Sequence, residues 1–409
     1  MGTGVPGGLQ NRRQADNTVC GGFDSCLFRH NKQKAREDFL KTYRVLNLIS
    51  IRWYNACAQY ALSIARALNQ EGSELYFAGC PGSPAITRAG EEGFTEIPDI
   101  NLASSNPLVF LLSVQRLKQF CREKGIQVVF SHSGPDHLAG ALIKIALSGL
   151  CYHIDVRADI RRPKNHFLNR FLYCRGSDRH LVPSRFMRAY FTDFGIAPEA
   201  VDYLPPCINT DHFRPRTAPS VLRQQLGLTD TDILFGVVAR LDPVKGHSVV
   251  MEAANRLSER RDIHFLISGD TFSVRPEGLR LLLNEKAKKQ VHFLNRVPDV
   301  RPLLQALDVG LISSIGSEAI CRIGLEMAAA GLPIIGTRVN SIPEMIDDEK
   351  GGLLIPPGES QALAQAVLRL SDDPSLRKKM GDYSLTRVQH EFGIQRFRER
   401  LILLVRSRP

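Results

Sequence analysis

Short apolar runs alternate with longer amphipathic stretches along this chain from residue 44 onward. An apolar run bounded by turn residues is typical of a buried strand, whereas apolar residues every three to four positions are typical of a helix. In the first half, strands are predicted at residues 45–50, 75–78, 127–131, 151–156 and 180–184, and helices at 56–69, 108–124, 138–147, 167–175 and 185–194. This alternation predicts an α/β domain with a parallel sheet, whose ligands lie at the carboxyl ends of the strands.

The same alternation resumes after a proline-containing segment at residues 203–213. Strands are predicted at residues 233–239, 264–268, 291–294, 308–312 and 331–337, and helices at 222–226, 248–260, 300–307, 361–370 and 374–380. Residues 233–239 contain no polar side chain, which indicates a fully buried strand. A chain of 409 residues is too long for one hydrophobic core, so two α/β domains are expected.

Residues 1–42 differ from the rest, because Gly, Asn, Gln and charged residues dominate and no apolar period is sustained. We interpret them as a mobile N-terminal extension, with a helix over residues 32–43 as a further expectation. Cys20, Cys26 and His30 could form a metal site, although isolated clusters of this kind usually bind nothing.

The net charge of +11 favours anionic partners, which include nucleoside diphosphates, acidic lipid surfaces and nucleic acid. The basic residues are scattered rather than gathered into one stripe, which argues against a nucleic-acid-binding protein. The nine cysteines are odd in number and irregularly spaced, so neither a disulfide framework nor structural zinc is expected. Because no long apolar run and no signal peptide is recognised, we expect a cytoplasmic protein, with peripheral contact to an anionic membrane as an option.

The stretch at residues 313–331, SSIGSEAICRIGLEMAAAG, combines a turn, two acids and a helix. The helix is expected to end at Gly331, and to begin between Glu318 and Glu326, so that Glu318 lies in the loop and Glu326 within the helix. A helix N-terminus has free N–H groups that suit a phosphate, and Arg322 adds a positive charge there. The segment is therefore either a site for a phosphorylated polyol or a surface helix with scattered charges.

This stretch resembles the Glu-x7-Glu signature of retaining glycosyltransferases of family 4, which have the GT-B fold. Further motifs of the family follow in its order: GLPIIGT at residues 331–337, SIPE at 341–344 and GGLLIPPG at 351–358. The resemblance covers residues 233–392 and, less closely, 43–210. It implies two Rossmann-like domains, at 43–210 and 211–385, whose parallel sheets face an interdomain cleft, and a C-terminal helix at 386–409 that crosses back to the first domain.

The resemblance also implies a donor site on the second domain. Arg240 and Lys245 would hold the diphosphate of a nucleotide sugar, with help from Arg322. Two fixed cations stabilise a leaving diphosphate most strongly in the transition state, when its charge develops. Because protein cations would take this role, neither a metal nor another cofactor is expected.

The same resemblance assigns the sugar and nucleoside contacts. Glu326 would bind the ribose hydroxyl groups and Glu318 the donor-sugar hydroxyl groups. Ile320 and Cys321 stand where relatives have Phe and Gly, so a differently shaped sugar pocket is expected. The remaining nucleotide-binding candidates follow two later strands and are Gly269, Arg296 and Val297.

On the acceptor side, His132 lies at the carboxyl end of the strand predicted at residues 127–131, where ligands of a parallel sheet are expected to bind. Arg157 stands where many relatives have a histidine, and Asp159 follows it. Asp159 could orient an acceptor hydroxyl group and Arg157 could hold a phosphate, or both could belong to a solvated basic loop. Trp53 is expected to be a packing residue, with a ligand contact as the alternative.

The helix at residues 167–175 carries aromatic residues together with Arg170 and Arg175. Its aromatic side is either part of the core or a surface for an anionic membrane.

The function expected from these features is a retaining transfer of a sugar from a nucleotide-diphosphate donor to a glycan or lipid-linked acceptor, in cell-envelope polysaccharide or lipopolysaccharide synthesis. Two alternatives use other chemistry. The first is a nucleotide-sugar epimerase or a phosphorylase on the same scaffold, because a fold does not fix a reaction. The second is a non-enzymatic basic protein that binds nucleic acid or a membrane. The pattern of residues does not indicate an oligomeric state.

Overall fold

The structure is a computed structural model that describes residues 42–147, 150–215 and 220–407. The chain divides into Met1–Thr42 and the compact unit Tyr43–Pro409. The predicted N-terminal extension, the candidate cluster of Cys20, Cys26 and His30, and all but the end of the predicted helix at 32–43 lie outside the described residues. Seven cysteines are described, and all of them are free thiols.

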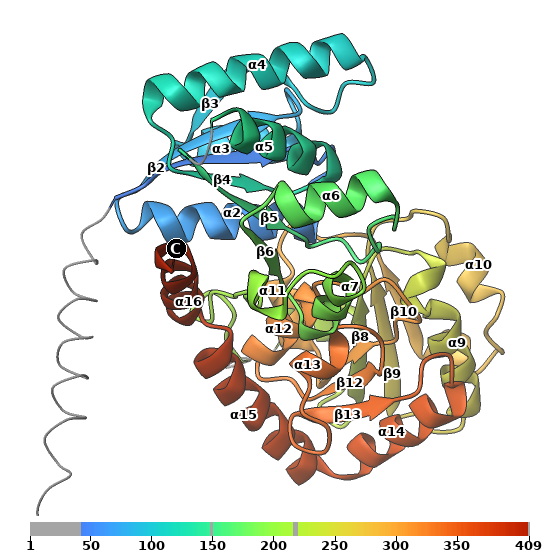
Figure 1. Cartoon of the computed structure of the whole chain (residues 1–409). Coiled ribbons are helices and arrows are strands. Elements are labelled where there is room, and N and C mark those ends of the chain that lie inside the picture. The colour runs from blue at the N-terminus through green and yellow to red at the C-terminus, as the bar shows by residue number, and fades with distance from the viewer. Residues whose placement is uncertain (1–41, 148–149, 216–219, 408–409) are drawn as a thin grey trace, which may run out of the picture. The chain divides into compact units, whose positions relative to one another are not determined.

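The first sheet has seven parallel strands in the order β3-β2-β1-β4-β5-β6-β7 (Figure 1). Its strands are β1 (Arg44–Ile49), β2 (Glu74–Gly79), β3 (Thr95–Asn101), β4 (Val128–Ser131), β5 (Tyr152–Val156), β6 (Arg179–Val182) and β7 (Val201–Tyr203). Its helices are α2 (Ala56–Asn69), α3 (Pro84–Glu91), α4 (Pro107–Lys124), α5 (Gly134–Ala146), α6 (Phe167–Arg175) and α7 (Arg188–Thr192). Apolar residues of α2 and α3 cover one face of the sheet, and those of α4 and α5 cover the other. We call this part the first lobe.

The second sheet has six parallel strands in the order β10-β9-β8-β11-β12-β13. Its strands are β8 (Ile233–Val238), β9 (Ile263–Ser268), β10 (Val291–Leu294), β11 (Val309–Ile312), β12 (Ile334–Thr337) and β13 (Gly352–Ile355). Its helices are α8 (Val221–Gln225), α9 (His247–Arg256), α10 (Pro276–Arg280), α11 (Arg301–Ala306), α12 (Arg322–Ala329), α13 (Ile342–Met345), α14 (Ser360–Asp372) and α15 (Pro374–Glu391). We call this part the second lobe.

Each sheet contains a point at which the strand order reverses, between β1 and β4 in the first lobe and between β8 and β11 in the second. At such a point the connections leave in opposite directions, and a crevice opens beyond the carboxyl ends of the strands. The two sheets therefore offer two crevices for ligands, and the candidate residues lie at both.

Helix α3 and strand β3 were not predicted from the sequence. The β3 sequence TEIPDIN is mostly polar and contains a proline, and β3 pairs with β2 alone because it lies at the sheet edge. An edge strand exposes one of its sides, so it needs neither an apolar run nor a complete set of backbone donors.

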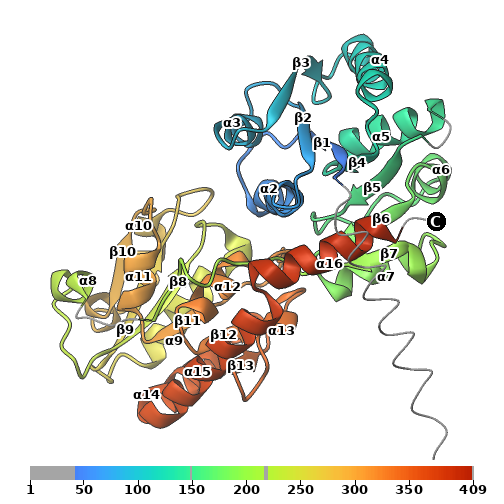
Figure 2. The ribbon, with the colours of Figure 1, turned by 90° about the vertical axis from the view of Figure 1, so that its left-hand side faces the viewer.

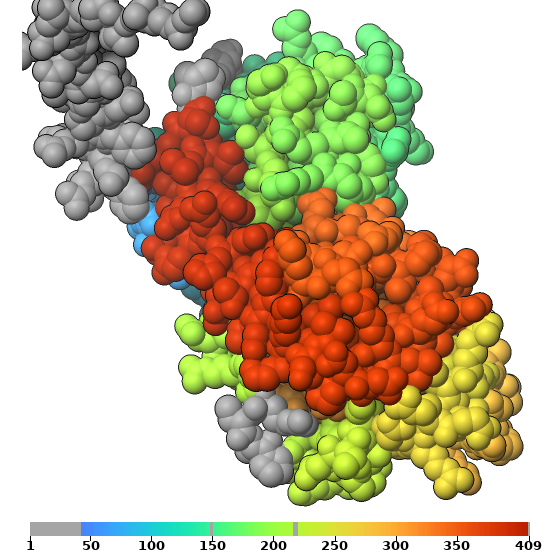
Figure 3. Space-filling model, turned by 90° about the horizontal axis from the view of Figure 1, so that it is seen from below, coloured from blue at the N-terminus to red at the C-terminus, as the bar shows by residue number. Residues whose placement is uncertain are grey.

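The last described helix, α16 (Ile394–Arg406), packs against α2 of the first lobe, whereas α15 packs against α12 of the second lobe. The two helices are separated by Phe392 and Gly393, which are not helical. The predicted domain boundary between residues 385 and 386 therefore falls inside α15. Figures 2 and 3 show α16, in red, continuing from the end of α15.

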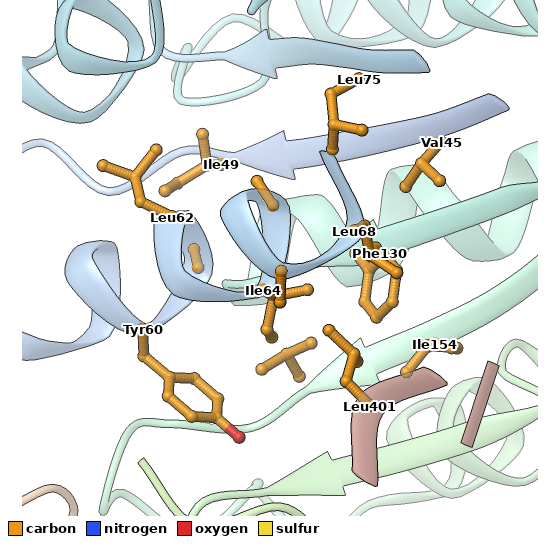
Figure 4. Close-up of a cluster of buried hydrophobic side chains, with 14 of the residues drawn as sticks. Val45, Ile49, Tyr60, Leu62, Ile64, Leu68, Leu75, Phe130, Ile154 and Leu401 are labelled. Carbon is orange, nitrogen blue, oxygen red and sulfur yellow. The ribbon is translucent and has the colours of Figure 1, made fainter. Parts of the chain in front are cut away.

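Helix α16 supplies part of the first hydrophobic core. Phe397, Leu401 and Val405 are buried in a cluster with α2 and strands β1, β4 and β5, and Figure 4 shows Leu401 among these side chains. The Phe397 ring meets the Tyr60 ring edge-on, with centroids 5.9 Å apart. The first lobe is therefore completed by residues far from it in the sequence.

We predict that Phe397→Ala destabilises the protein by about 3–5 kcal/mol, because it removes a buried aromatic ring and leaves a cavity. Phe397 is 2% exposed, whereas Leu403 on the same helix is 66% exposed. The control Leu403→Ala should change the free energy of unfolding by no more than about 0.5 kcal/mol. Urea unfolding of both variants measures the difference, and equal losses would contradict the packing of α16 described above.

Candidate functional site

The loop after β8 positions two of the predicted cations. Asp242 Oδ1 accepts a hydrogen bond from Val244 N at 3.2 Å and starts a short 3-10 turn, which ends at Lys245. Gly246 follows with a φ of +67°, and a Cβ there would lie 2.0 Å from the carbonyl oxygen of Ser313. Only glycine allows this contact, so the loop after β8 can lie directly against the chain that leaves β11.

Glu318 is fixed where the chain leaves β11. Its carboxylate forms an ion pair with Lys245 Nζ, and its Oε1 accepts a hydrogen bond from Ser314 Oγ at 2.5 Å. The Glu318 side chain is 7% exposed. A buried carboxylate is stable only with such partners, because its charge has lost its water.

The backbone of Glu318 is held from a neighbouring loop. Its carbonyl oxygen accepts hydrogen bonds from Ser341 N at 3.1 Å and Ser341 Oγ at 2.8 Å. Its N–H donates to Asn340 Oδ1 at 3.3 Å. The sequence analysis did not single out Asn340, and Ser341 entered it only as the first residue of the SIPE motif, without a role.

Helix α12 begins at Arg322, so Glu318 lies in the loop before it and Glu326 within it, as the sequence predicted. Cys321 at its N-cap forms no side-chain cap, and the N–H groups of Arg322 and Gly324 donate to the carbonyl oxygens of Ile320 and Cys321 at 3.0 and 3.1 Å. Arg322 Nε donates to Glu326 Oε1 at 2.6 Å. Burial raises the pKa of Glu326, and the charge of Arg322 opposes that rise.

Arg240 lies at the rim of this group. Its Nη2 atom is 2.7 Å from Asp242 Oδ2, and its guanidinium carbon is 4.2 Å from the centroid of the Phe272 ring. Half of the Arg240 side chain is exposed. The arginine is therefore held in place and still open to a ligand.

Several of these residues line a cavity of about 200 Å³ at the carboxyl ends of β8 and β11. We call it the donor cavity, after the role that the sequence predicts for its residues. The predicted site residues that line it are Arg240, Lys245, Glu318, Ile320, Cys321 and Arg322. Glu326 does not line the cavity, but it accepts a hydrogen bond from Arg322, which does.

Three other candidates lie outside the wall of the donor cavity. Gly269 packs against the backbone of Ala239, since a Cβ on it would lie 1.9 Å from the Ala239 oxygen. Arg296 pairs with Asp270 at 3.2 Å, and Val297 packs against the hydrophobic cluster that contains Leu304 and Ile312. Gly269 follows β9, whereas Arg296 and Val297 follow the neighbouring strand β10.

A second pocket, of about 510 Å³, lies at the carboxyl ends of β1, β4 and β5 in the first lobe. We call it the first-lobe pocket; His132, Arg157 and Asp159 line it. Asp159 accepts a hydrogen bond from Arg161 Nε at 2.9 Å. Burial acts to raise the pKa of Asp159, but the hydrogen bonds from Arg161 hold it below the usual value.

His132 and Trp53 line the same pocket but differ in their exposure to solvent. His132 is buried, and burial lowers its pKa to about 3, so its ring is neutral at physiological pH. Trp53 lines the pocket and is 76% exposed, so the predicted packing role of this tryptophan is wrong. The Trp53 ring is therefore part of the pocket lining and open to solvent.

The chain contains one Asp-x-Asp triplet, a pattern often found in metal sites, at residues 230–232. It lies in the turn before β8, at the opposite end of that strand from Arg240, and Asp232 caps this turn by accepting from Thr229 N at 2.7 Å. Among the described residues, no group of three or more His, Cys, Asp and Glu side chains could hold a metal ion.

Family comparisons match both lobes. The family model for glycosyl transferases group 1 matches residues 220–387, and that for glycosyltransferase family 4 matches residues 57–212. A GDP-mannose-dependent monoacylated alpha-(1-6)-phosphatidylinositol monomannoside mannosyltransferase of Corynebacterium glutamicum is 28% identical over 234 residues, covering 54% of this chain and 60% of the relative. A D-inositol 3-phosphate glycosyltransferase of Corynebacterium urealyticum is 30% identical over 217 residues, covering 50% of each chain. The chain thus spans 60% or less of these curated relatives' lengths.

Solved structures share the fold. Anabaena HepE in complex with UDP has a TM-score of 0.78 at 18% identity, covering 89% of this chain and 100% of HepE. A glycosyltransferase from Rickettsia africae has a TM-score of 0.79 at 17% identity, covering 90% of this chain and 98% of its own. The predicted GT-B fold, with two Rossmann-like domains and parallel sheets, is confirmed.

We predict that Gly246→Ala destabilises the protein more than Gly82→Ala does. Both glycines have a φ of +67°, so each alanine costs about 1–2 kcal/mol of backbone strain. A Cβ at Gly82 meets nothing within 4 Å, whereas at Gly246 it must displace the Ser313 backbone. Thermal unfolding measures the difference, and equal shifts in melting temperature would refute the close approach of the two loops.

Proposed function

This chain belongs to glycosyltransferase family 4, and we propose that it transfers a sugar from a nucleotide-diphosphate donor to an acceptor hydroxyl group. The observation that carries the proposal is the convergence of Lys245, Glu318 and the start of α12 on one cavity. Positive side chains and the positive end of a helix dipole suit a diphosphate, and a fixed carboxylate suits sugar hydroxyl groups.

In the proposed mechanism, the diphosphate lies between Arg240, Lys245 and the N-terminus of α12. When the bond from the sugar to the diphosphate breaks, the electron pair stays on the diphosphate oxygen, whose negative charge grows. Cations that are already in position stabilise this growing charge without further rearrangement. We propose that these protein cations meet the need for positive charge and that no metal is required.

Each cation of the donor site is paired with a carboxylate before a donor arrives. The pairs are Arg240 with Asp242, Lys245 with Glu318, and Arg322 with Glu326. A diphosphate brings further negative charge, so it shares these cations and loosens the pairs. The Glu318 and Glu326 oxygens then become free to accept hydrogen bonds from the sugar and the ribose.

We propose that the first-lobe pocket binds the acceptor, a glycan or a lipid-linked molecule of cell-envelope polysaccharide or lipopolysaccharide synthesis. The name of the corynebacterial mannosyltransferase describes a lipid acceptor, which supports the lipid-linked option. We further propose that the sugar keeps its anomeric configuration, because the chain carries the Glu-x7-Glu signature of retaining enzymes. Comparing the anomeric proton couplings of donor and product by NMR tests retention.

The alternatives receive less support. The family matches cover both lobes, and the relatives reported above carry transferase names rather than epimerase or phosphorylase names. A basic binding protein would have no need for two carboxylates at the mouth of a cationic cavity.

We predict that Lys245→Gln weakens binding of a nucleoside diphosphate by about 10–100-fold, because it removes a charge-assisted contact to phosphate. Binding of the matching nucleoside without phosphate should change little. Thermal shifts with a panel of nucleoside diphosphates and nucleotide sugars identify the base, and titration calorimetry with that nucleotide gives the affinities. In Lys245→Gln, the rate of sugar transfer should fall by a larger factor than the affinity for the nucleotide. In the wild type, a metal chelator should leave the rate of sugar transfer unchanged.

Lys288→Gln is the matched control, because Lys288 is an exposed lysine of the same lobe that pairs with Glu285. It should leave both affinity and turnover unchanged. If Lys245→Gln binds the nucleoside diphosphate as tightly as the wild type does, Lys245 does not contact the diphosphate and the proposed donor site is wrong.

We also propose peripheral contact with an anionic membrane through α6. Phe167, Leu168 and Phe171 of this helix are exposed, and Tyr173 is its only buried residue, so the membrane interpretation of its aromatic side is favoured over the core. Beside α6 runs an open groove of about 760 Å³, lined by phenylalanines together with Arg170 and Arg175. The α6 sequence contains no acidic residue. Within the described part of the chain, no helix has both the length and the apolar character to cross a bilayer.

We predict that Phe167→Ser combined with Phe171→Ser reduces co-sedimentation with phosphatidylglycerol vesicles by about tenfold or more, because two apolar anchors are lost. Leu281→Ser is the control, because Leu281 is 83% exposed in the second lobe. Binding should also weaken as salt rises. If the double variant sediments like the wild type, α6 is not the membrane surface.

A further inference from the structure

We infer that the acceptor carries a phosphate group, and that the first-lobe pocket binds this group through Arg157. The inference rests on the proposed function, because it names the chemical class of the acceptor for the same reaction. It is carried by the unbalanced charge of the pocket and by the unused hydrogen-bonding capacity of Arg157.

The charged side chains that line the first-lobe pocket are three arginines and one aspartate: Arg52, Arg157, Arg161 and Asp159. The other titratable groups with a resolved shift in its lining are His132 and Cys57, and both are neutral, because burial lowers the pKa of His132 and raises the pKa of Cys57 to about 12. The pocket wall therefore has an excess of about two positive charges, which equals the charge of a phosphate monoester near neutral pH. The donor cavity differs, because each of its cations is paired with a carboxylate.

Arg157 has hydrogen-bond donors that lack a protein partner. Its Nη2 atom donates to the carbonyl oxygen of Arg161 at 3.2 Å, and its buried Nε atom has no hydrogen-bond partner. No salt bridge described for this part of the chain includes Arg157, whereas Arg161 is paired with Asp159. A buried guanidinium N–H without a partner is costly, and a phosphate oxygen would satisfy it.

The acids near Arg157 are engaged elsewhere. Asp155, buried below the pocket, is 3.2 Å from His180 Nδ1 and accepts from Ser131 Oγ at 3.3 Å. Asp136, in the first turn of α5, accepts from Ser50 N at 3.0 Å and from Ser133 Oγ at 2.6 Å. Asp136 is therefore engaged in its own loop. Burial acts to raise the pKa of Asp155, but His137, His180 and Arg157 hold it below its usual value, so the ionised Asp155 offsets part of the Arg157 charge from beneath the pocket.

Other groups at the pocket suit the rest of such a molecule. Arg52 donates to the carbonyl oxygen of Ala103 at 3.0 Å, which leaves its other donors to solvent or ligand. The exposed Trp53 ring at the rim offers a flat apolar face on which a sugar or polyol ring can lie. The structure thus assigns a phosphorylated polyol to this pocket, either as a soluble sugar phosphate or as a lipid headgroup.

The test measures phosphate binding with the donor site disabled, because the donor cavity also binds phosphate. In a Lys245→Gln background, titration calorimetry compares glucose 6-phosphate with glucose, a pair that differs only in the phosphate. We expect glucose 6-phosphate to bind at least tenfold more tightly than glucose, and Arg157→Gln to abolish that difference. Arg157→Lys should restore part of it, because the charge returns without the forked donors.

Arg116→Gln is the matched control, since Arg116 also donates to a backbone carbonyl, that of Asp99 at 2.9 Å, and lies on α4. It should leave the preference for glucose 6-phosphate intact. Nucleoside diphosphate binding in an otherwise wild-type protein should be unaffected by Arg157→Gln, which separates failure of this inference from failure of the proposed donor site. Equal affinity for glucose and glucose 6-phosphate in the Lys245→Gln background overturns the inference.

The source of the phosphate is distinguished by vesicles. Phosphatidic acid presents a phosphate monoester, whereas phosphatidylglycerol, adjusted to the same surface charge, does not. A preference for phosphatidic acid vesicles that disappears in Arg157→Gln supports the site and indicates a lipid acceptor. If Arg157→Gln loses glucose 6-phosphate binding but the wild type binds phosphatidic acid and phosphatidylglycerol vesicles equally, the site is supported and the acceptor is a soluble molecule.

Discussion

The ion pair between Lys245 and Glu318 is the interaction on which the donor site depends. The two residues leave different strands, β8 and β11, which are neighbours at the reversal of strand order in the second sheet. Removing either partner would leave an uncompensated charge in a buried place, which is far more costly than the net gain from forming the pair. The close approach at Gly246 brings the two loops near enough for the pair to form. Strand order, one glycine and one ion pair therefore define a single geometry.

The two lobes organise charge in opposite ways. In the second lobe, carboxylates balance the cations, so the side chains of the site are together nearly neutral, and the proposed donor would bind by exchanging partners. In the first lobe, arginines exceed acids around the pocket, and one guanidinium N–H has no partner. A balanced site selects a ligand by the arrangement of its groups, because only a molecule with both phosphates and hydroxyl groups replaces every contact. An unbalanced site selects first by charge.

Much of the fold could be predicted from the sequence, because the central strands β1, β4, β8 and β11 are apolar runs that only a buried sheet explains. The edge strand β3 could not, since its polar residues and proline carry no strand signal. Glu318, Lys245 and Arg240 were predicted from the family resemblance, and the structure brings them to one cavity. Asn340 and Ser341 contribute ordinary hydrogen-bonding groups whose role exists only after folding. Trp53 was misjudged because apolar character alone does not distinguish a core ring from one at a pocket rim.

The position of α16 has a consequence for biosynthesis. Its buried residues, which extend to Val405, belong to a core whose strands begin at residue 44. As the polypeptide emerges from the ribosome, the first sheet can assemble early, but one face of α2 stays exposed until the residues up to Val405 have been translated. The second sheet, by contrast, has its own helices close in sequence. Chaperones should therefore bind the nascent chain mainly at the first lobe, whose apolar face on α2 stays uncovered until α16 has been synthesised.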